Sequence, residues 1–298
     1  MNIENVNQAA EAYLADAEGA EKARLEFMKG LWTLQAELEG LSADYTAPDA
    51  GAARDALATG QPLFLVSTPD VPADAFRDAI GRVIAYIRES AVLEEAEAKA
   101  LAGDDVVAAI TDSMIATAVR DFDAFVIAVS DALTSDTGRT APSQATLAFA
   151  LHSALVPFLT GASTAALESL GTLERALWGS GHCPVCGSAA SMGRMSESTK
   201  LKGSERTLWC SQCRAEWAYE RLRCVRCGSR TQDKLRYTYE EGDPAHRLHL
   251  CDTCHGYAKM TFVDEMAKPI SMPVEEAVSV TLDAIAHAHG YTVTSTDA

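Results

Sequence analysis

Eight cysteines, arranged as four Cys-x-x-Cys pairs, are the residues of this sequence best suited to chemistry. All of them fall in the last 116 residues of the 298-residue chain. Thiolate sulfur binds soft or borderline metal ions, and four thiolates fill the tetrahedral positions around zinc or iron. The pairs are Cys183/Cys186, Cys210/Cys213, Cys224/Cys227 and Cys251/Cys254. The sequence therefore predicts metal sites built from protein sulfur.

The pairs form a tandem repeat with an offset of 41 residues. In each copy, 23 residues separate the first pair from the second. Gly187-Ser188 follows the first pair of the first copy, and Gly228-Ser229 follows that of the second copy. An arginine, Arg206 or Arg247, stands four residues before each second pair. Eight thiolates in two equal sets predict two tetrahedral metal sites.

The spacing within each pair suits a tight turn. Such a turn aims both sulfurs at one ion, and its backbone amides point back at the sulfurs. Gly187 and Gly228 follow the first pairs, where the chain must turn with little side-chain hindrance. The second pairs lack that glycine and continue with Arg214 and His255. The residues between the pairs are expected to form a small antiparallel sheet that brings the second pair to the first.

Other uses of the cysteines fit less well. Disulfides need an oxidising compartment, but the polar, acidic N-terminus does not read as a secretory signal. A thioredoxin-type redox pair occurs once beside a βαβ pattern, not four times in register. With eight sulfur ligands, neither ion keeps an open position for substrate, so we predict no enzyme activity and no catalytic residue. His182 and His255 could act as ligands only by breaking a four-sulfur set.

Charge is distributed unevenly along the chain. The formal net charge is −17, and residues 1–182 carry 27 acidic and 11 basic side chains. Residues 183–260 carry 13 basic and 9 acidic side chains, and eight thiolates with two divalent ions bring that stretch close to neutral. A nucleic-acid-binding protein normally presents a basic face, so we predict no nucleic-acid partner. The basic run over 221–230 is interpreted as a solvated face or as partners of Glu216 and Glu220.

The first 180 residues contain no cysteine and are rich in Ala, Leu and Glu at helical spacing. Helices are expected over 21–41, from Asp74 onward, and over 104–133, 144–159 and 164–178. They predict an all-α bundle of five to seven helices. The most apolar stretch, 146–160, is shorter than the ~20 residues that span a membrane. We therefore predict a buried helix rather than membrane insertion, with His152 as a core histidine rather than a ligand.

A boundary at Gly179-Ser180-Gly181 separates the helical part from the cysteines. The expected fold class is α+β: an N-terminal all-α helical bundle, two tandem rubredoxin-like (zinc-ribbon-like) metal modules and a C-terminal helix. The predicted domains are 1–180 for the helical bundle, 181–222 and 223–268 for the two modules, and 269–298 for the C-terminal helix and tail. A strand is expected over 260–263, and the final helix over 274–289.

Several motifs in the C-terminal half resemble a known family. Residues 178–188 read W-G-S-G-H-C-P-V-C-G-S, residues 206–217 read R-T-L-W-C-S-Q-C-R-A-E-W, and residues 221–228 read R-L-R-C-V-R-C-G. Tyr237, Cys251-Asp252-Thr253-Cys254 and Tyr257-Ala258-Lys259 complete the series. Together they resemble the formate dehydrogenase accessory protein FdhE family. The resemblance extends through 282–284 and 290–291, whereas the N-terminal half fits by its helical character and by residues 25–35.

The resemblance implies a helical domain with two rubredoxin-like iron sites, with zinc as the alternative metal. By position, the ligands of the first site are Cys183, Cys186, Cys210 and Cys213, and those of the second are Cys224, Cys227, Cys251 and Cys254. It also implies a cytoplasmic, chaperone-like maturation protein that binds the catalytic subunit of formate dehydrogenase before assembly or export. Ala218, where members often have histidine, and residues 275–278 depart from the family pattern, which bears on the identity of the client.

Two other functions are compatible with the cysteine spacing. One is a rubredoxin-type electron carrier, although simple electron shuttling does not explain the large helical domain. The other is a zinc-ribbon module for nucleic-acid or protein interaction. The acidic net charge of the chain argues against nucleic acid as the partner of such a module. The metal content and absorption spectrum of the protein discriminate between iron and zinc.

Overall fold

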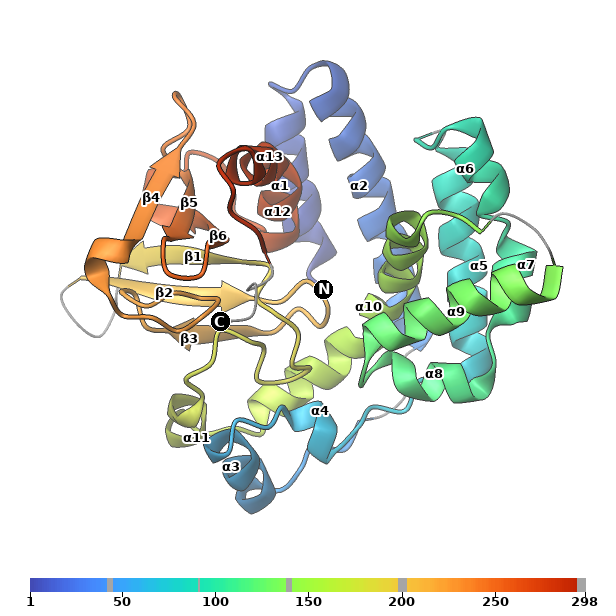
Figure 1. Cartoon of the computed structure of the whole chain (residues 1–298), viewed down its shortest axis with the longest axis horizontal. Coiled ribbons are helices and arrows are strands. Elements are labelled where there is room, and N and C mark those ends of the chain that lie inside the picture. The colour runs from blue at the N-terminus through green and yellow to red at the C-terminus, as the bar shows by residue number, and fades with distance from the viewer. Residues whose placement is uncertain (42–44, 91, 138–140, 198–202, 294–298) are drawn as a thin grey trace.

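The computed structural model describes residues 1–298 except for 42–44, 91, 138–140, 198–202 and 294–298. A helical part comes first, one mixed sheet follows, and two C-terminal helices pack back against both (Figure 1). The expected α+β class, with helices first and the cysteines in the sheet-containing half, is confirmed. The tail beyond residue 293 lies outside the described residues.

The described ranges contain more helices before the sheet than the five to seven expected. They are α1 (Ile3–Leu14), α2 (Gly19–Leu38) with the 3-10 turn η1 (Glu39–Leu41), α3 (Ala50–Ala58), α4 (Leu63–Val66), α5 (Ala73–Glu89), α6 (Glu95–Ala100), α7 (Gly103–Ala109), α8 (Asp112–Ala118), α9 (Phe122–Thr137), α10 (Gln144–Glu168) and α11 (Thr172–Leu177). Helices α5–α9 form a lobe on the side of the molecule away from the sheet (Figure 1).

Two expected helices have different limits in the structure. The expected helix over 104–133 is divided into α7, α8 and α9, because Thr111 and Asp121 each begin a new helix. The Thr111 hydroxyl accepts from the Met114 amide, and the Asp121 carboxylate accepts from the Ala124 amide. Conversely, the break expected between 159 and 164 is absent from the described α10, which continues to Glu168.

The central helix α10 runs through the core and contacts α2, α5 and α9. Among the described helices it alone is long and apolar enough to cross a membrane by composition. However, 67% of its most apolar 18-residue window is buried inside the protein, which is typical of a core helix. The expectation of a buried helix holds, although the helix is 25 residues long rather than about 15.

Pro157 lies inside α10 and cannot donate a backbone hydrogen bond to the Ser153 carbonyl one turn earlier. The buried Gln35 side chain of α2 supplies the missing donor, because its Nε2 lies 2.9 Å from the Ser153 oxygen. A proline is thus accommodated in the core without leaving a buried carbonyl unpaired.

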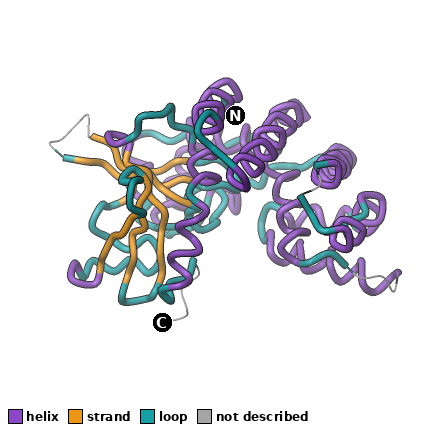
Figure 2. Tube along the Cα trace, turned by 90° about the horizontal axis from the view of Figure 1, so that it is seen from above, coloured by secondary structure: helices purple, strands orange, loops and turns teal. Residues whose placement is uncertain are grey.

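Six strands form one sheet, in the order β3-β2-β1-β6-β5-β4. Figure 2 shows the strands gathered at one end of the molecule, with helices beside them. The strands are β1 (Met192–Glu197), β2 (Ser204–Trp209), β3 (Glu216–Tyr219), β4 (Leu235–Tyr239), β5 (His246–Cys251) and β6 (Gly256–Phe262). Each repeat copy contributes three antiparallel strands, as expected. The two halves are joined by the parallel pair β1–β6, in which Met192 pairs with Lys259.

The C-terminal segment comprises α12 (Met272–Val278) and α13 (Val280–Ala288) rather than one helix. Val274 of α12 packs between α1 and α2, against Val6 and Trp32. Leu282 and Ala286 of α13 pack on the sheet, where they contact Leu248 and Tyr257. The end of the chain therefore ties the first helices to the second repeat copy.

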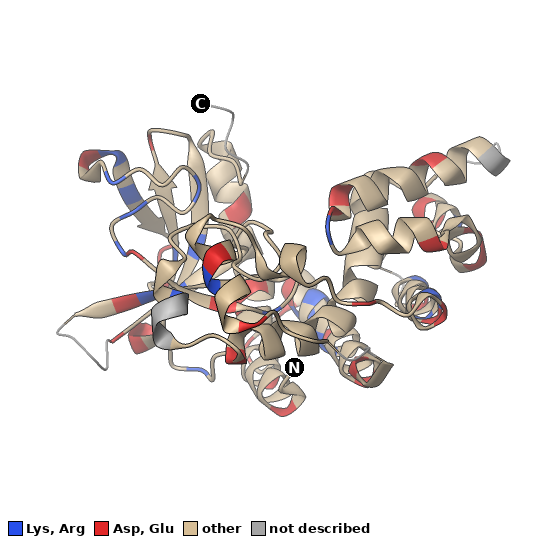
Figure 3. Ribbon diagram, turned by 90° about the horizontal axis from the view of Figure 1, so that it is seen from below, with Lys and Arg blue, Asp and Glu red and all other residues tan. Residues whose placement is uncertain are grey.

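The charge asymmetry expected from the sequence is visible in three dimensions. Acidic segments are spread over the helices, including those of the lobe, whereas basic segments gather on loops at the sheet end of the molecule (Figure 3). Of the 13 basic residues in 183–260, the 11 that the structure describes belong to this part of the chain.

Candidate metal centres

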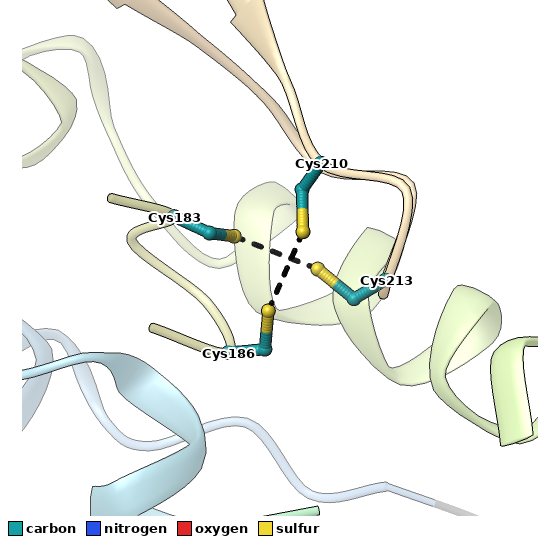
Figure 4. A group of neighbouring side chains, drawn as sticks. All are labelled: Cys183, Cys186, Cys210 and Cys213. Atoms are coloured by element: carbon teal, nitrogen blue, oxygen red, sulfur yellow. Dashed lines mark hydrogen bonds between the residues drawn. The ribbon is translucent and has the colours of Figure 1, made fainter. Parts of the chain in front are cut away.

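The first four cysteines converge on one point (Figure 4). Cys183 and Cys186 come from the loop before β1, and Cys210 and Cys213 come from the turn of the β2–β3 hairpin. The Cys183 and Cys213 sulfurs are 3.5 Å apart, and so are those of Cys186 and Cys210. We call this group the first site.

The second four cysteines repeat this arrangement. Cys224 and Cys227 precede β4, and Cys251 and Cys254 form the turn of the β5–β6 hairpin. The Cys224 and Cys254 sulfurs are 3.8 Å apart, as are those of Cys227 and Cys251. In this second site, as in the first, the first cysteine of one pair lies beside the second cysteine of the other.

Both groups fit a tetrahedral ion. A zinc–sulfur bond of about 2.3 Å gives a tetrahedron whose sulfur–sulfur edges are about 3.8 Å long. The observed 3.5 and 3.8 Å separations are close to that edge. Within each group all four sulfurs lie within 4.8 Å of one another, so each could hold one metal ion with four thiolates.

The backbone around the sulfurs has the geometry that the spacing predicts. Amides of the Cys-x-x-Cys turns point at sulfur: the Val185 amide donates to Cys183 at 3.4 Å, and the Arg226 amide donates to Cys224 at 3.3 Å. Gly187 and Gly228 adopt left-handed backbone angles, with φ of 84° and 73°. The hydrogen bonds from the Val185 and Arg226 amides spread the negative charge of the thiolates.

The second pairs reach the same left-handed conformation without glycine. Arg214 has φ 65° and His255 has φ 52°, a conformation that costs other residues about 1–2 kcal/mol. Each side chain has a contact that helps to offset this cost. Arg214 reaches the Gln35 Oε1 at 3.2 Å, and the His255 ring lies 5.8 Å from the Tyr291 ring.

Neighbouring groups shift the pKa values of these thiols in different directions. In the first site, hydrogen bonds from the other three cysteines lower the pKa of Cys186 well below its usual value, whereas burial raises the pKa of Cys183. In the second site, the amides of Cys254 and Thr253 overcome burial and lower the pKa of Cys251. Each group thus favours some thiolate character, and a bound cation would stabilise the remaining charges.

The first site is part of the main hydrophobic core. Cys183, Cys210 and Cys213 are fully buried, and they cluster with residues of the helical part. The first turn of α4 is oriented toward this site. Its Leu63 amide donates to the Pro184 carbonyl at 2.9 Å, and its Phe64 amide donates to the Val185 carbonyl at 2.8 Å. The carbonyls between Cys183 and Cys186 therefore satisfy helix amides that would otherwise lack partners.

Gln35 connects the first site to the central helix. Its Nε2 donates to the Ser153 carbonyl freed by Pro157, while its Oε1 accepts from Arg214 of the Cys210/Cys213 turn. His152 lies in the same region and stacks edge-on against Phe122 at 5.9 Å. Burial, followed by the nearby Arg214, lowers the pKa of His152 to about 4. Its role as a core histidine stays a prediction.

The second site has a different environment. Cys227 is exposed, and the three other cysteines form a small cluster with Leu235. Arginines surround the loop that carries Cys224 and bind backbone carbonyls. Arg226 donates to the Tyr257 and Ala190 carbonyls at 2.8 and 3.0 Å, and Arg223 donates to those of Gly228 and Gly179 at 3.1 and 2.6 Å.

Sequence reasoning missed a buried polar cluster beside the second repeat copy. The His246 ring contacts the Asp243 carboxylate at 2.7 Å and the Glu275 carboxylate at 2.8 Å, and the Tyr13 hydroxyl donates to Glu275 at 2.9 Å. These groups come from α1, from α12 and from β5 with the loop before it. The available signal was Glu275 in the short helix α12, where four of the other residues are Met, Val, Ala and Val. However, the Tyr13 and His246 partners of Glu275 lie far away in sequence.

Comparison with known proteins shows relatives over part of the chain. No family model matches. A curated protein called Protein FdhE homolog, from Aquifex aeolicus, is 33% identical over 119 residues, which are 40% of this chain and 41% of that protein. The protein of that name from Pseudomonas putida is 36% identical over 143 residues, 44% of this chain and 43% of the relative. The chain thus matches about two fifths of the length of these relatives.

The similarity in fold extends over more of the chain than the similarity in sequence. The crystal structure of the FdhE protein from Pseudomonas aeruginosa has a TM-score of 0.57 with this chain, at 21% identity. The match covers 99% of this chain and 95% of that one. The expected resemblance is therefore confirmed: this chain is similar in sequence to proteins called Protein FdhE homolog over about two fifths of its length, and it is similar in fold to the FdhE crystal structure over nearly all of it.

Proposed function

We propose that this chain is an accessory protein for the maturation of a formate dehydrogenase. It binds the catalytic subunit of that enzyme before assembly or export, and it is not itself an enzyme. The support comes from the cysteine motifs, from curated relatives called Protein FdhE homolog, and from a fold shared with an FdhE protein. We place this activity in the cytoplasm, where reduced thiols suit metal ligation rather than disulfides.

One observation favours a binding function over a catalytic function. Each site brings together four cysteine sulfurs at distances close to a tetrahedral edge. Four sulfur ligands leave an ion no open position for substrate or water. The sites are therefore suited to hold the sheet and the surrounding loops in shape, and the surface they support is suited to bind a partner.

We propose iron as the metal in both sites, with zinc as the alternative. Cys183, Cys186, Cys210 and Cys213 would hold one ion, and Cys224, Cys227, Cys251 and Cys254 the other. An iron ion in such a site supplies one-electron chemistry, whereas zinc has no redox chemistry. An absorption spectrum and metal analysis of protein purified without oxygen separate the two.

The partner we propose is the catalytic subunit. We propose that the chain binds no nucleic acid and does not insert into a membrane. A maturation factor must release its client, so we expect a transient interface at the small end, about 1,200 Å² or less. If the acidic helical part provides the contact, affinity falls with ionic strength. If the near-neutral sheet end provides it, the net charge of that end adds little salt dependence, and any effect of salt comes from local ion pairs.

The test compares a deletion strain with its parent. We expect the deletion strain to make the formate dehydrogenase polypeptide with little activity, and the purified chain to capture the catalytic subunit in a pull-down. The pull-down is repeated at low and high salt. Full enzyme activity in the deletion strain, together with absent capture, would contradict the proposal.

A second candidate is an electron carrier of rubredoxin type. The exposure of Cys227 favours it, because an exposed ligand shortens the path for electrons to a partner. This candidate requires iron in the second site and reversible bleaching of its absorption on reduction. A colourless protein with two zinc ions removes it.

A further inference from the structure

A small cavity lies beside the second site, between the loop that carries Cys224 and strands β4–β6. Its volume is about 130 Å³, and an engineered cavity of about 150 Å³ holds one benzene ring. One amino-acid side chain therefore fills it. Leu235, Leu250 and Ala258 provide apolar lining.

The charged residues that line this cavity are all basic. Among the residues that the structure describes, no Asp or Glu lines it. The basic residues are Arg206, Arg221, Arg223, Arg226, Arg236 and His249.

Within the described part of the chain, one of the five lining arginines, Arg236, has a carboxylate partner. A site filled with a divalent ion carries about two negative charges from its four thiolates, and Asp252 pairs with Arg236 at 2.7 Å. Arg206, Arg223 and Arg226 donate to backbone carbonyls. Glu220 and Asp283 also act on Arg206 and Arg226 from outside the cavity. Each of these two carboxylates already pairs with another cation, Glu220 with Arg230 and Asp283 with Lys259, so the lining itself stays basic.

Two of these arginines have unused donors. Arg221 is exposed and makes no ion pair within the part of the chain that the structure describes. Arg206 is 3% exposed, and its Nε has no hydrogen-bond partner there either. A buried donor without an acceptor is costly, and a carboxylate is the strongest acceptor for a guanidinium group.

Strand β4 runs along this cavity and forms one edge of the sheet (Figure 1). Leu235, Arg236 and Tyr237 belong both to β4 and to the cavity lining. Tyr237 is 62% exposed and Tyr239 is 49% exposed. An edge strand with exposed aromatic side chains is a template for the addition of another strand.

We propose that an extended acidic segment of the partner protein adds to the edge of β4 and places one carboxylate side chain in this cavity. Charge complementarity identifies the segment as acidic, because residues 1–182, with 27 acidic and 11 basic side chains, repel it elsewhere. The identity of the partner as the catalytic subunit rests on the proposed function, whereas the chemistry of the segment does not.

Fluorescence anisotropy with the metal-loaded full chain tests this. The probe is a labelled peptide of alternating Glu and Val, and a Gln/Val peptide of equal length is its control. We expect the Gln/Val peptide and the Arg221→Gln variant each to weaken binding at least about tenfold, the loss expected for one charged hydrogen bond. Arg230→Gln is the matched variant, because Arg230 lies in the same basic run, pairs with Glu220 and is outside the cavity lining; it should leave binding unchanged.

Three results would overturn the inference. They are equal affinity for the two peptides, an Arg221→Gln variant that binds as tightly as the parent chain, and β4 amides that gain no protection from hydrogen exchange when the peptide is bound. Displacement of the peptide by inorganic phosphate at equal concentration would mark a simple anion site and would also overturn it.

Capture of the catalytic subunit separates this inference from the proposed function. If the parent chain and Arg221→Gln capture the subunit equally well, the inference fails and the proposed function stands. If the Glu/Val peptide binds as expected but neither protein captures the subunit, the proposed function fails and the docking of an acidic strand stands.

Discussion

The first and second sites share one internal geometry and differ in what surrounds them. The first lies in the main core, beside α4 and next to Gln35, with three of its four cysteines fully buried. The second lies at the sheet end, with Cys227 exposed and arginines around its loop. The repeat has thus duplicated the ligands without duplicating their environment. A four-cysteine motif predicts an ion, whereas its neighbours determine whether that ion supports a core or a surface.

The largest difference between the sites is expected on losing one ligand. Cys183→Ser should abolish folding of the sheet and loosen the helical core, because metal binding in such sites contributes on the order of 10 kcal/mol to folding. Cys227→Ser should release only the second ion and leave the helices intact. Metal analysis and thermal unfolding by circular dichroism measure both. Equal losses of structure in the two variants would contradict the comparison, and two ions retained by each would refute the ligand assignment.

A chelator should remove the ions from the two sites at different rates. With a limiting chelator we expect one ion per chain to leave quickly, because the exposed Cys227 gives access to the second site. The other ion should leave only as the helical signal is lost. Metal release followed with a chromophoric chelator, alongside circular dichroism, checks this. Simultaneous release of two ions would show that exposure of one sulfur does not control access.

The second repeat copy is joined to the helical part by the cluster around His246. Burial lowers the pKa of His246, but contacts with Asp243 and Glu275 raise it more, to about 9. Because the ordinary value is about 6.5, this stabilisation is complete below pH 6.5 and is lost as the pH rises through 9. The loss should be at most about 3 kcal/mol.

Urea unfolding at pH 6 and at pH 9.5 measures this effect. The matched control is His246→Gln, which cannot be protonated and should remove this part of the pH dependence. A fall in stability of the same size in both proteins would assign the effect to other groups.

A smaller effect is expected at the connection between the first site and the core. Gln35→Leu removes the donor to the Ser153 carbonyl and the acceptor of Arg214, which should cost about 1–3 kcal/mol. In a Pro157→Ala background the residue 157 amide can bond to Ser153, so the same change should cost less. A double-mutant cycle by urea unfolding gives the coupling. Additive effects would mean that Gln35 does not compensate for Pro157.

The two groups of four cysteines could be predicted because the motif that defines each group is local in sequence. Two residues between cysteines define a turn, and the 41-residue offset shows which pairs are equivalent. The position of each site relative to the core could not be predicted in this way. It depends on contacts such as that of the Leu63 amide with the Pro184 carbonyl, which link residues more than a hundred positions apart.

The helices illustrate the same limit. The apolar periodicity over 104–133 is continuous and predicts one helix. In the structure, Thr111 and Asp121 instead accept hydrogen bonds at the N-termini of two new helices. The expected end of a helix at 159 is likewise not observed, because α10 continues to Glu168. The domain limits 1–180, 181–222, 223–268 and 269–298 stay predictions. Contacts across them, including Val274 with Trp32, indicate units that stabilise one another.

The parallel pair β1–β6 has a consequence for the chain as it is synthesised. The first strand of the sheet lies beside the last, so β1 has its final neighbour only after on the order of 60 further residues have left the ribosome. At about 5–20 residues per second, that takes roughly 3 to 12 seconds. The first site has all its ligands once Cys213 emerges, whereas the second waits for Cys254. During this interval the edge of β1 that later pairs with β6 is open. An ion held by the first four cysteines would tie the loop before β1 to the β2–β3 turn and so support the pairing of β1, β2 and β3.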